Sequence, residues 1–357
     1  MQLTLLVPEL IWPEPDDSDT FGGLACPALN TLLARSRLTR RPPQSLEATL
    51  SDAFGLPEGA PYAAFRLLGE ANTPVEVGAS CWLCSDPVHL RFHQERLILA
   101  DSGSFGIALD EAQALAEALN THLADLGRFH VATAERWYLQ VAVNGALDAS
   151  SLANFDVPPL SAVAGRSIER LLPETAKTKE LRKLLNEAQM LLHAHAINQK
   201  RQNTGRLPIN SLWLWGAGTL PERSESGFDG VWSTNPLALG LARAAGVPTH
   251  PLPLDLSVLL EHAAPETSHL IVLEDLLGAV QYENGDAYRT TLTSLESRWF
   301  APLRSALATG KIRQLRLEAS TAYAALAWES RRSDQWKLWR RPQTLVTVAQ
   351  NLAKGNI

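Results

Sequence analysis

The residue types best suited to hold an anion gather in one short segment of this chain. Asp86, His89 and Arg91 fall within the run DPVHLR, at the junction of an expected loop and a strand. Arg136 stands at the start of a later expected strand, and arginine binds phosphate or carboxylate through two parallel hydrogen bonds. A structural aspartate turn beside a half-buried histidine explains the same residues, and we favour that simpler interpretation.

A glycine pair follows an apolar run later in the chain. Gly216 and Gly218 come after residues 212–215, which we expect to form a buried strand. Backbone N–H groups in such a turn can bind an anion, although the pair lacks the third glycine and the immediate helix of a dinucleotide-binding motif. A tight turn without a ligand explains the pair equally well. The candidate ligand-binding residues are Asp86, His89, Arg91, Arg136, Gly216 and Gly218.

The cysteines and histidines give weaker signals. Cys81 and Cys84 have the spacing of a redox pair or of half a zinc site, but they lie in an expected strand, where residues three apart point to opposite faces. The remaining ligands of a closed zinc site are not visible in the sequence. His193 and His195, two apart on an expected helix, do not face each other. We therefore predict no metal or cofactor, and we interpret the cysteines as buried and unreactive.

Residues 331–342, RRSDQWKLWRRP, mix basic side chains with tryptophans. Base stacking together with phosphate neutralisation would suit single-stranded nucleic acid. A surface strand or helix with packed tryptophans is the simpler interpretation, because the formal net charge is −6 and no second basic patch is visible. We accordingly expect a small anionic ligand or a protein partner, and no nucleic acid.

The composition is that of a globular protein, with 45% hydrophobic and 20% charged residues among 357. Its negative charge disfavours binding to anionic membranes, and no run reaches the roughly 18–20 apolar residues of a membrane span. The first residues lack the basic start of a targeting peptide. Three cysteines do not make a disulfide framework. The expected location is the cytoplasm.

The order of the expected elements predicts an α/β fold, with a mostly parallel sheet sandwiched by helices. Between the amino-terminal part and the strand–helix alternation that resumes at Asn210 lies a β–β–β–α–β block, typical of an inserted α+β module. We predict a core domain from residues 1–76 and 150–357 and an inserted domain at residues 77–149.

Hydrophobic periodicity and capping residues give the individual elements. A proline- and glycine-rich passage at 56–74 and a connector at 144–175 separate some of them. A helix begins at Pro27, and the other main helices are expected at 45–54, 110–126, 178–199, 237–245, 256–262 and 286–307. The strands are expected at 1–7, 79–83, 88–92, 96–100, 136–143, 212–215, 269–273 and 312–319.

Residues 210–246 contain a set of characteristic residues, in a fixed order, around an expected apolar strand and helix. They are Asn210, Gly216, Gly218, Pro221, Gly230 and the ending Ala245-Gly246. This order resembles the cofactor-independent phosphoglycerate mutases, especially the archaeal-type branch of the alkaline phosphatase superfamily. Residues 24–36 resemble a helix near the amino end of that family, and residues 79–143 are similar to its insertion domain. The resemblance implies an alkaline-phosphatase-like core.

The resemblance also implies two divalent metals held by aspartate and histidine, and a serine or threonine that carries the phosphate. Three of the metal-binding positions correspond here to Glu9, Glu283 and Glu318, so the family's histidines are missing. Of the arginines that contact substrate in the insertion domain, Arg136 persists. Because two-metal phosphoryl transfer needs both metals to neutralise charge and align the nucleophile, the resemblance implies a weakened site.

Three functions follow from these observations. We favour a degenerate phosphoglycerate-mutase-like protein that binds a ligand or a partner in regulation, since the scaffold is retained while most metal ligands are lost. Residues 86–91 and 212–218 also resemble proteobacterial RpfE-type regulatory proteins. The second is a working metal-dependent phosphoglycerate mutase or phosphohydrolase, using Mn²⁺ or Zn²⁺ at a rearranged site. The third is nucleic-acid binding through residues 331–341. The second would draw its ligands from Glu9, Glu274, Asp275, Glu283 and Glu318.

Overall fold

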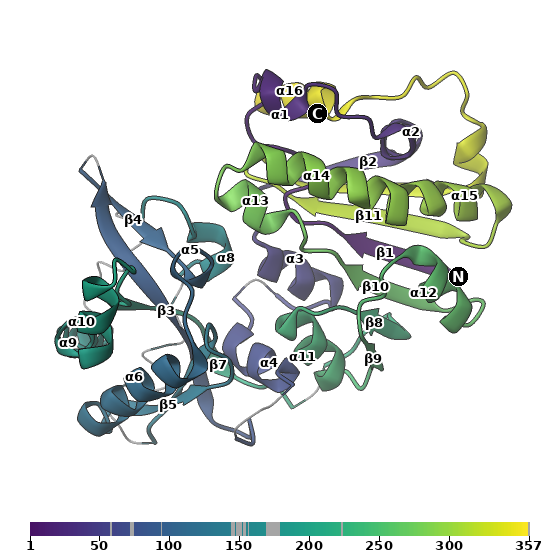
Figure 1. The fold of residues 1–357 in the computed structure, drawn as a ribbon. Coiled ribbons are helices and arrows are strands. Elements are labelled where there is room, and N and C mark those ends of the chain that lie inside the picture. Colours follow the sequence, from purple (N-terminus) through teal and green to yellow (C-terminus); the bar gives the residue numbers. More distant parts are fainter. Residues whose placement is uncertain are drawn as a thin grey trace. The chain divides into compact units, whose positions relative to one another are not determined.

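The computed structural model describes residues 1–57, 59–71, 75–93, 95–143, 147, 152, 155, 157–168, 179–222 and 224–355. The chain forms two compact units, which we call unit 1 and unit 2 (Figure 1). Unit 1 consists of Met1–Thr49 and Glu225–Ile357, and unit 2 consists of Leu50–Ser224. The block predicted as an insertion, residues 77–149, lies within unit 2, which extends further along the chain on both sides.

Unit 1 is built on a seven-stranded sheet with the order β2-β12-β11-β1-β10-β8-β9. Strands β11, β1, β10, β8 and β9 pair in parallel, whereas β12 and β2 are antiparallel. The predicted mostly parallel α/β sheet is confirmed. The strands are β1 (Gln2–Leu6), β2 (Arg37–Arg41), β8 (Gly230–Trp232), β9 (Thr249–His250), β10 (Ser268–Val272), β11 (Gln314–Ser320) and β12 (Ala325–Arg331).

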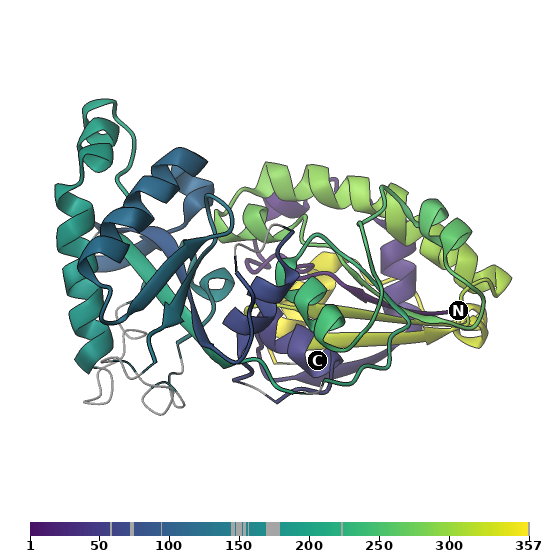
Figure 2. The ribbon, with the colours of Figure 1, turned by 90° about the horizontal axis from the view of Figure 1, so that it is seen from below.

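Helices bury the apolar faces of this sheet. Figure 2 shows the light-green helices α14 and α15 lying along one face of the strands. Their buried leucines join those of the strands in one hydrophobic core. The helices of unit 1 are α1 (Ser18–Phe21), α2 (Pro27–Arg35), α11 (Pro236–Ala244), α12 (Leu256–His262), α13 (Leu277–Gln281), α14 (Gly285–Leu295), α15 (Ala301–Thr309) and α16 (Leu345–Ala353), and α3 (Leu46–Ala53) crosses the boundary to unit 2.

The long helix predicted at residues 286–307 contains a π-helical segment, Glu296–Phe300, between α14 and α15. Glu296 is buried, and its carboxylate accepts hydrogen bonds from the backbone N–H groups of Ala28 at 2.6 Å and Leu29 at 3.1 Å. These donors belong to the first turn of α2, where a negative charge is favourable. Cys26 at the helix start provides no side-chain cap, so Glu296 takes that role.

Unit 2 is built on antiparallel strands. The sheet has the order β4-β3-β6-β5, and β7 also pairs with β3. Two expectations are wrong here. The strands expected at 79–83 and 88–92 are one long strand, which begins at Cys81, and residues 212–215 belong to β7 of this antiparallel sheet rather than to the parallel one. The strands are β3 (Cys81–His93), β4 (Arg96–Ala100), β5 (Gly127–Val131), β6 (Trp137–Val141) and β7 (Ser211–Thr219).

The helices of unit 2 also depart from the sequence pattern. The passage at 56–74 contains α4, and the helix predicted at 178–199 is divided at His195, whose ring Nδ1 accepts a hydrogen bond from the Ile197 N–H at 3.2 Å. Residue 178 and most of the connector at 144–175 lie outside the described residues. The helices are α4 (Tyr62–Gly69), α5 (Ser102–Phe105), α6 (Leu109–His122), α8 (Leu160–Val163), α9 (Lys179–Ala194) and α10 (Ala196–Asn203).

Across the ranges given above, no helix combines the length and the apolar character needed to cross a membrane.

Candidate functional site

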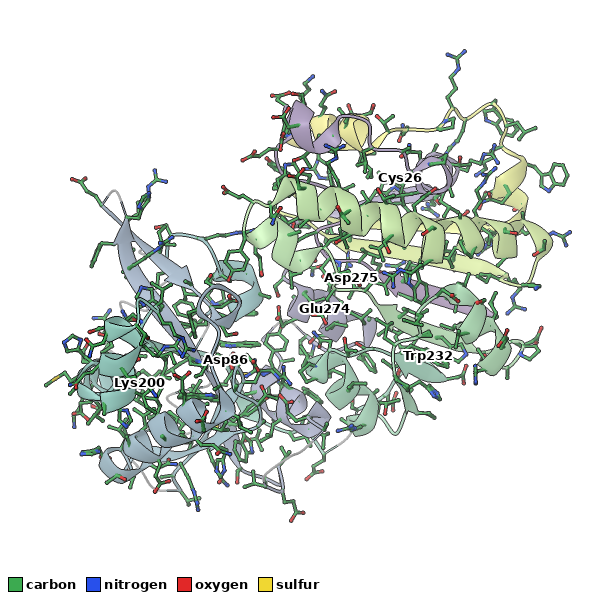
Figure 3. The ribbon with its side chains drawn as sticks, in the orientation of Figure 1. Cys26, Asp86, Lys200, Trp232, Glu274 and Asp275 are labelled. Carbon is green, nitrogen blue, oxygen red and sulfur yellow. The ribbon has the colours of Figure 1, made fainter. Side chains whose placement is uncertain are left out.

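Asp86 lies in the middle of β3 and is completely buried (Figure 3). Its carboxylate forms a bidentate ion pair with Arg66 of α4, with Nη1–Oδ2 and Nη2–Oδ1 distances of 2.8 and 2.6 Å. It also accepts hydrogen bonds from the indole of Trp215 at 2.9 Å and the backbone N–H of Trp137 at 3.3 Å. Burial alone would lower the pKa of Arg66, but its polar neighbours, with Asp86 the largest contributor, together raise that pKa well above its ordinary value.

Arg136 is paired in the same region. Its guanidinium binds the buried carboxylate of Glu70 bidentately, at 2.7 and 2.9 Å. Tyr138 donates its hydroxyl to Glu70 at 2.6 Å and accepts a hydrogen bond from Arg66 at 2.9 Å. Burial alone would raise the pKa of Glu70, but the hydrogen bonds from Arg136 and Tyr138 hold it below its ordinary value.

The result is a continuous polar network inside unit 2, which we call the buried network: Arg136, Glu70, Tyr138, Arg66 and Asp86. Two arginines balance two carboxylates, and the guanidinium of Arg66 also stacks on the rings of Tyr138 and Trp215. Arginines already paired in this way need no external anion. Sequence reasoning missed Arg66, although a lone arginine in the apolar run YAAFRLLG was a visible signal.

His89 and Arg91 do not join the buried network. They are three and five residues from Asp86 along β3 and therefore point to the opposite face of the strand. His89 Nδ1 donates to the Pro208 carbonyl at 2.8 Å, and burial lowers the pKa of His89. Arg91 is exposed. The structure thus separates the Asp, His and Arg of the DPVHLR segment.

Gly216 and Gly218 lie within β7, which continues through them to Thr219, so the predicted turn that ends the strand is wrong. Both have positive φ angles, 65° and 149°. A Cβ on Gly216 would lie 2.9 Å from Tyr62 Cβ, and one on Gly218 would lie 2.6 Å from Pro61 Cβ. The glycines therefore permit a close approach between β7 and the start of α4.

Glu318, one of the carboxylates considered as a metal ligand, lies on β11 in unit 1. It pairs with Arg316, two residues earlier on the same face of the strand, and Arg316 also pairs with Glu329 of β12. Burial alone would lower the pKa of Arg316, but the two carboxylates raise it. Glu318 thus already has a cationic partner within the chain.

Glu274 and Asp275 follow β10 directly (Figure 3). Glu274 accepts a hydrogen bond from the amide of Asn235 at 2.7 Å, and the same amide's oxygen caps α11. Asp275 lies 3.5 Å from the guanidinium of Arg298. Both carboxylates are therefore engaged with groups of the chain itself.

Glu9 and Glu283 complete the set considered for a metal. Glu9 follows β1 and is half-buried, whereas Glu283 is exposed between α13 and α14. Both adopt positive φ angles, 56° and 52°. Among the residues that the structure describes, no three His, Cys, Asp or Glu side chains come close enough together to hold a metal ion. The donors present therefore do not fit the two-metal site that the resemblance implies.

The structure also describes the cysteine pair and the tryptophans of residues 331–342. Cys84 is completely buried, and Cys81 is half-buried with its pKa raised by burial. The tryptophans expected to pack at the carboxyl-terminal segment do not: Trp336 and Trp339 are 74% and 77% exposed. That expectation is wrong for both side chains, which follow the end of β12 at Arg331.

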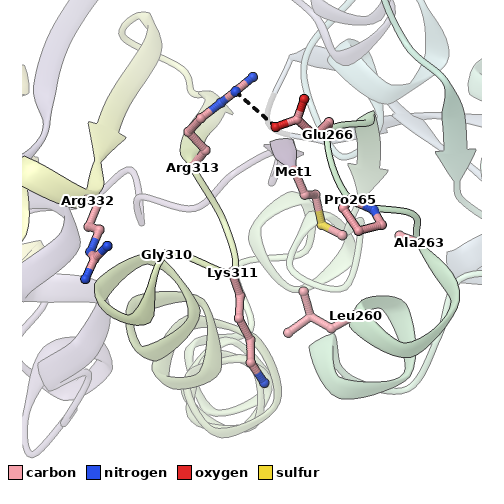
Figure 4. Close-up of a pocket in the computed structure, with 9 residues that line it drawn as sticks. All are labelled: Met1, Leu260, Ala263, Pro265, Glu266, Gly310, Lys311, Arg313 and Arg332. Atoms are coloured by element: carbon pink, nitrogen blue, oxygen red, sulfur yellow. Dashed lines mark ion pairs between the residues drawn. The ribbon is translucent and has the colours of Figure 1, made fainter.

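Unit 1 contains a cavity of about 580 Å³ at the end of the sheet where β1 begins (Figure 4). One side is apolar and the other carries cations, so the cavity could hold a flat apolar group with a negative charge beside it. Arg313 and Glu266 form an ion pair at its rim, at 3.6 Å. Its lining is Met1, Leu260, Ala263, Pro265, Glu266, Gly310, Lys311, Arg313 and Arg332.

Curated relatives of this chain are phosphoglycerate mutases. The 2,3-bisphosphoglycerate-independent phosphoglycerate mutase of Methanosarcina mazei is 28% identical over 208 residues, which are 55% of this chain and 49% of the relative. A probable enzyme of the same name from Geobacter sulfurreducens is 30% identical over 222 residues, 60% of this chain and 54% of the relative. The chain thus spans about half the length of the curated relatives it matches. No family model matches it.

Solved structures give the same fold. The cofactor-independent phosphoglycerate mutase of Thermoplasma acidophilum superposes over the whole of both chains with a TM-score of 0.50 and 16% identity. A protein of Pyrococcus horikoshii superposes over 99% of this chain and 95% of its own with a TM-score of 0.58 and 13% identity. This chain therefore has a phosphoglycerate-mutase-like, alkaline-phosphatase-superfamily fold, and the sequence resemblance to the archaeal-type mutases is confirmed.

Proposed function

We propose that this phosphoglycerate-mutase-like protein acts in regulation by binding a small anionic ligand or a protein partner, without two-metal phosphoryl transfer. One observation carries the proposal: Glu318 pairs with Arg316, which also holds Glu329. A metal at Glu318 would have to displace or approach this guanidinium, and like charges at short range repel strongly where water is excluded.

Glu274 and Asp275 support the proposal in the same way, because each already interacts with a group of unit 1. To bind a metal, Glu274 would lose a charge-assisted hydrogen bond worth about 1.5–3 kcal/mol, whereas the long, partly exposed pair of Asp275 with Arg298 contributes at most about 1 kcal/mol. Metal binding at this end of the sheet would therefore be weak. Phosphoryl transfer by two metals needs both of them bound.

The test is an assay of 2- and 3-phosphoglycerate interconversion and of aryl phosphate hydrolysis, with Mn²⁺, Zn²⁺ or EDTA. We expect no turnover that depends on a metal. The Methanosarcina mazei mutase, assayed in parallel, shows that the conditions support the reaction.

A working enzyme is the second candidate, and the observation that favours it is the sequence similarity to proteins named as mutases. It predicts Mn²⁺-dependent turnover that disappears in Glu318→Gln and Glu274→Gln. Glu261→Gln, which alters an exposed carboxylate outside the set considered for a metal, serves as the matched control and should keep its activity. That pattern of results would overturn the regulatory proposal.

A further inference from the structure

Three large apolar side chains stand exposed within four residues of unit 1. Trp336, Leu338 and Trp339 are 74%, 70% and 77% exposed. Trp336 ends a 3₁₀ helix, Arg332–Trp336, and the other two lie in the tight turn after it, where the Leu338 N–H donates to the Trp336 carbonyl at 2.8 Å. Single exposed apolar residues are ordinary, but a cluster of this kind marks an interaction surface.

The segment is held firmly by its neighbours. Arg35 of α2 donates to the Gln335 carbonyl at 2.6 Å, and Arg340 donates to the carbonyls of Ser36 and Ala34 at 3.1 and 3.3 Å. The tryptophans are therefore presented from a fixed backbone. A preorganised surface loses less conformational entropy when a partner binds.

Strand pairing brings a second group of cations to the same place. In the sheet, Gln314 of β11 lies opposite Arg331 of β12, and Glu329 of β12 lies opposite Arg37 of β2. The start of β11, the end of β12 and the start of β2 therefore lie at one end of the sheet. The second basic patch that the sequence did not show is thus assembled from separate segments. The exposed cations there are Arg37, Lys311, Arg313, Arg331, Arg332 and Arg340.

The cavity of about 580 Å³ opens among these cations. Lys311, Arg313 and Arg332 line it together with the apolar side chains of Leu260 and Pro265 (Figure 4). The pair of Arg313 with Glu266 is long and exposed, so it holds Arg313 only weakly. The apolar part of this hollow could contact a flat base, and the exposed cations beside it could bind the flanking phosphates.

We propose that this basic–tryptophan surface, consisting of the six cations with Trp336 and Trp339, binds single-stranded nucleic acid. The cations neutralise phosphates, and the indole rings stack on bases. The hollow favours a nucleic acid over a lipid bilayer, because a bilayer presents a flat surface. This inference goes beyond the regulatory proposal and concerns a surface distinct from the carboxylates discussed there.

The test is fluorescence anisotropy with labelled oligothymidylate and oligouridylate of about 20 nucleotides. We expect binding that weakens about 50-fold between roughly 50 and 200 mM salt if four phosphates are contacted. Replacing Trp336 and Trp339 together by alanine should weaken binding by about 30-fold or more if each ring stacks on one base. The charge reversals Arg313→Glu and Arg332→Glu should weaken it and also flatten its salt dependence.

Two variants of unit 2 are matched controls. Phe92 is 79% exposed, so Phe92→Ala removes an exposed aromatic ring elsewhere, and Lys200→Glu reverses an exposed charge on α10 (Figure 3). Both should bind oligonucleotides like the parent protein. No anisotropy change at low salt, or equal losses in the controls, would overturn the proposal. So would binding to phosphatidylserine vesicles with none to oligonucleotides, which would assign the surface to a membrane instead.

Discussion

The buried network of unit 2 and the basic–tryptophan surface of unit 1 are made from the same kinds of residue in opposite circumstances. In the network, Arg66 and Asp86 are buried and satisfy each other within the chain. On the surface, Arg332 and Trp336 extend into solvent. Both regions combine arginine with tryptophan, so residue type alone does not distinguish a stabilising cluster from a binding surface.

The difference between the two regions lies in where the partners come from. A buried charge is tolerated only with a matched partner, and the network supplies each partner from a neighbouring strand or helix. An exposed ring or cation contributes little to folding and remains available to another molecule. The comparison therefore predicts large effects on stability in the network and effects on binding alone at the surface.

The largest effect is expected for Asp86→Ala. The substitution leaves Arg66 buried without a carboxylate and removes the acceptor of the Trp215 indole. Breaking a buried pair in this way should cost about 3–5 kcal/mol of unfolding free energy. Urea denaturation measures the loss.

A double variant, Arg66→Met with Asp86→Leu, separates the unpaired charge from simple loss of packing. It should recover much of the stability, because replacing both partners of a buried pair is often nearly neutral. A loss below about 1 kcal/mol in Asp86→Ala would show that the network does not hold unit 2 together.

Arg136→Ala should have the next largest effect, about 1.5–3 kcal/mol, because it leaves the buried Glu70 without its charged donor. It should also change the pH dependence of stability. The lowered pKa of Glu70 means that its contribution is present above the unfolded pKa of about 4.3 and is lost as pH falls through the lower folded pKa. In the variant the folded pKa of Glu70 rises, so the gap to the unfolded pKa shrinks and stability should fall less steeply between neutral and acid pH than in the parent.

Thermal unfolding between pH 7 and pH 3 measures this shift. Tyr138→Phe is the matched comparison, since it removes only one neutral donor to Glu70. Identical pH profiles for Arg136→Ala and the parent would contradict the assigned role of the ion pair.

Gly218→Ala should destabilise by about 1–3 kcal/mol, because the new Cβ would overlap Pro61 at 2.6 Å and φ is 149°. Gly227→Ala is the control, since nothing lies within 4 Å of a Cβ there and its φ is not positive. Urea denaturation should show the loss in the first variant alone. Equal stability of the two would mean that β7 does not need its glycines for contact with α4.

The smallest effect on stability is expected at the surface. Trp336→Ala removes a ring that is 74% exposed and should change unfolding free energy by no more than about 0.5 kcal/mol. Calorimetry checks this. A loss of 2 kcal/mol or more would place Trp336 in a packed environment and remove the contrast between the two regions.

Part of the fold could be predicted from the sequence because local signals set it. The helix at 256–262 and the strand at 96–100 appear where periodicity placed them. The strand at 212–215 also exists, but its sheet could not be predicted, because pairing with β3 depends on residues more than a hundred positions away. The two strands expected at 79–83 and 88–92 are one strand, β3, which passes through Pro87.

The candidate site was harder to predict for the same reason. Asp86 and Arg136 were chosen for their chemistry, and the structure places both in one network. Their partners Arg66 and Glu70 come from a passage whose prolines and glycines concealed α4. Only the tertiary structure shows that these partners already satisfy both residues. The sequence also disfavours nucleic-acid binding because it shows no second basic patch. That patch forms only when strand pairing brings cations from separate segments together.

The most direct test of the regulatory proposal is thermal unfolding of the full chain with EDTA, with excess Mn²⁺ and with excess Zn²⁺. A ligand that binds only the folded state raises the melting temperature by mass action. Because Glu318, Glu274 and Asp275 already have partners within unit 1, we predict the same melting temperature in all three conditions. A rise with Mn²⁺ that EDTA reverses would contradict the proposal and favour a metal-dependent phosphomutase or phosphohydrolase.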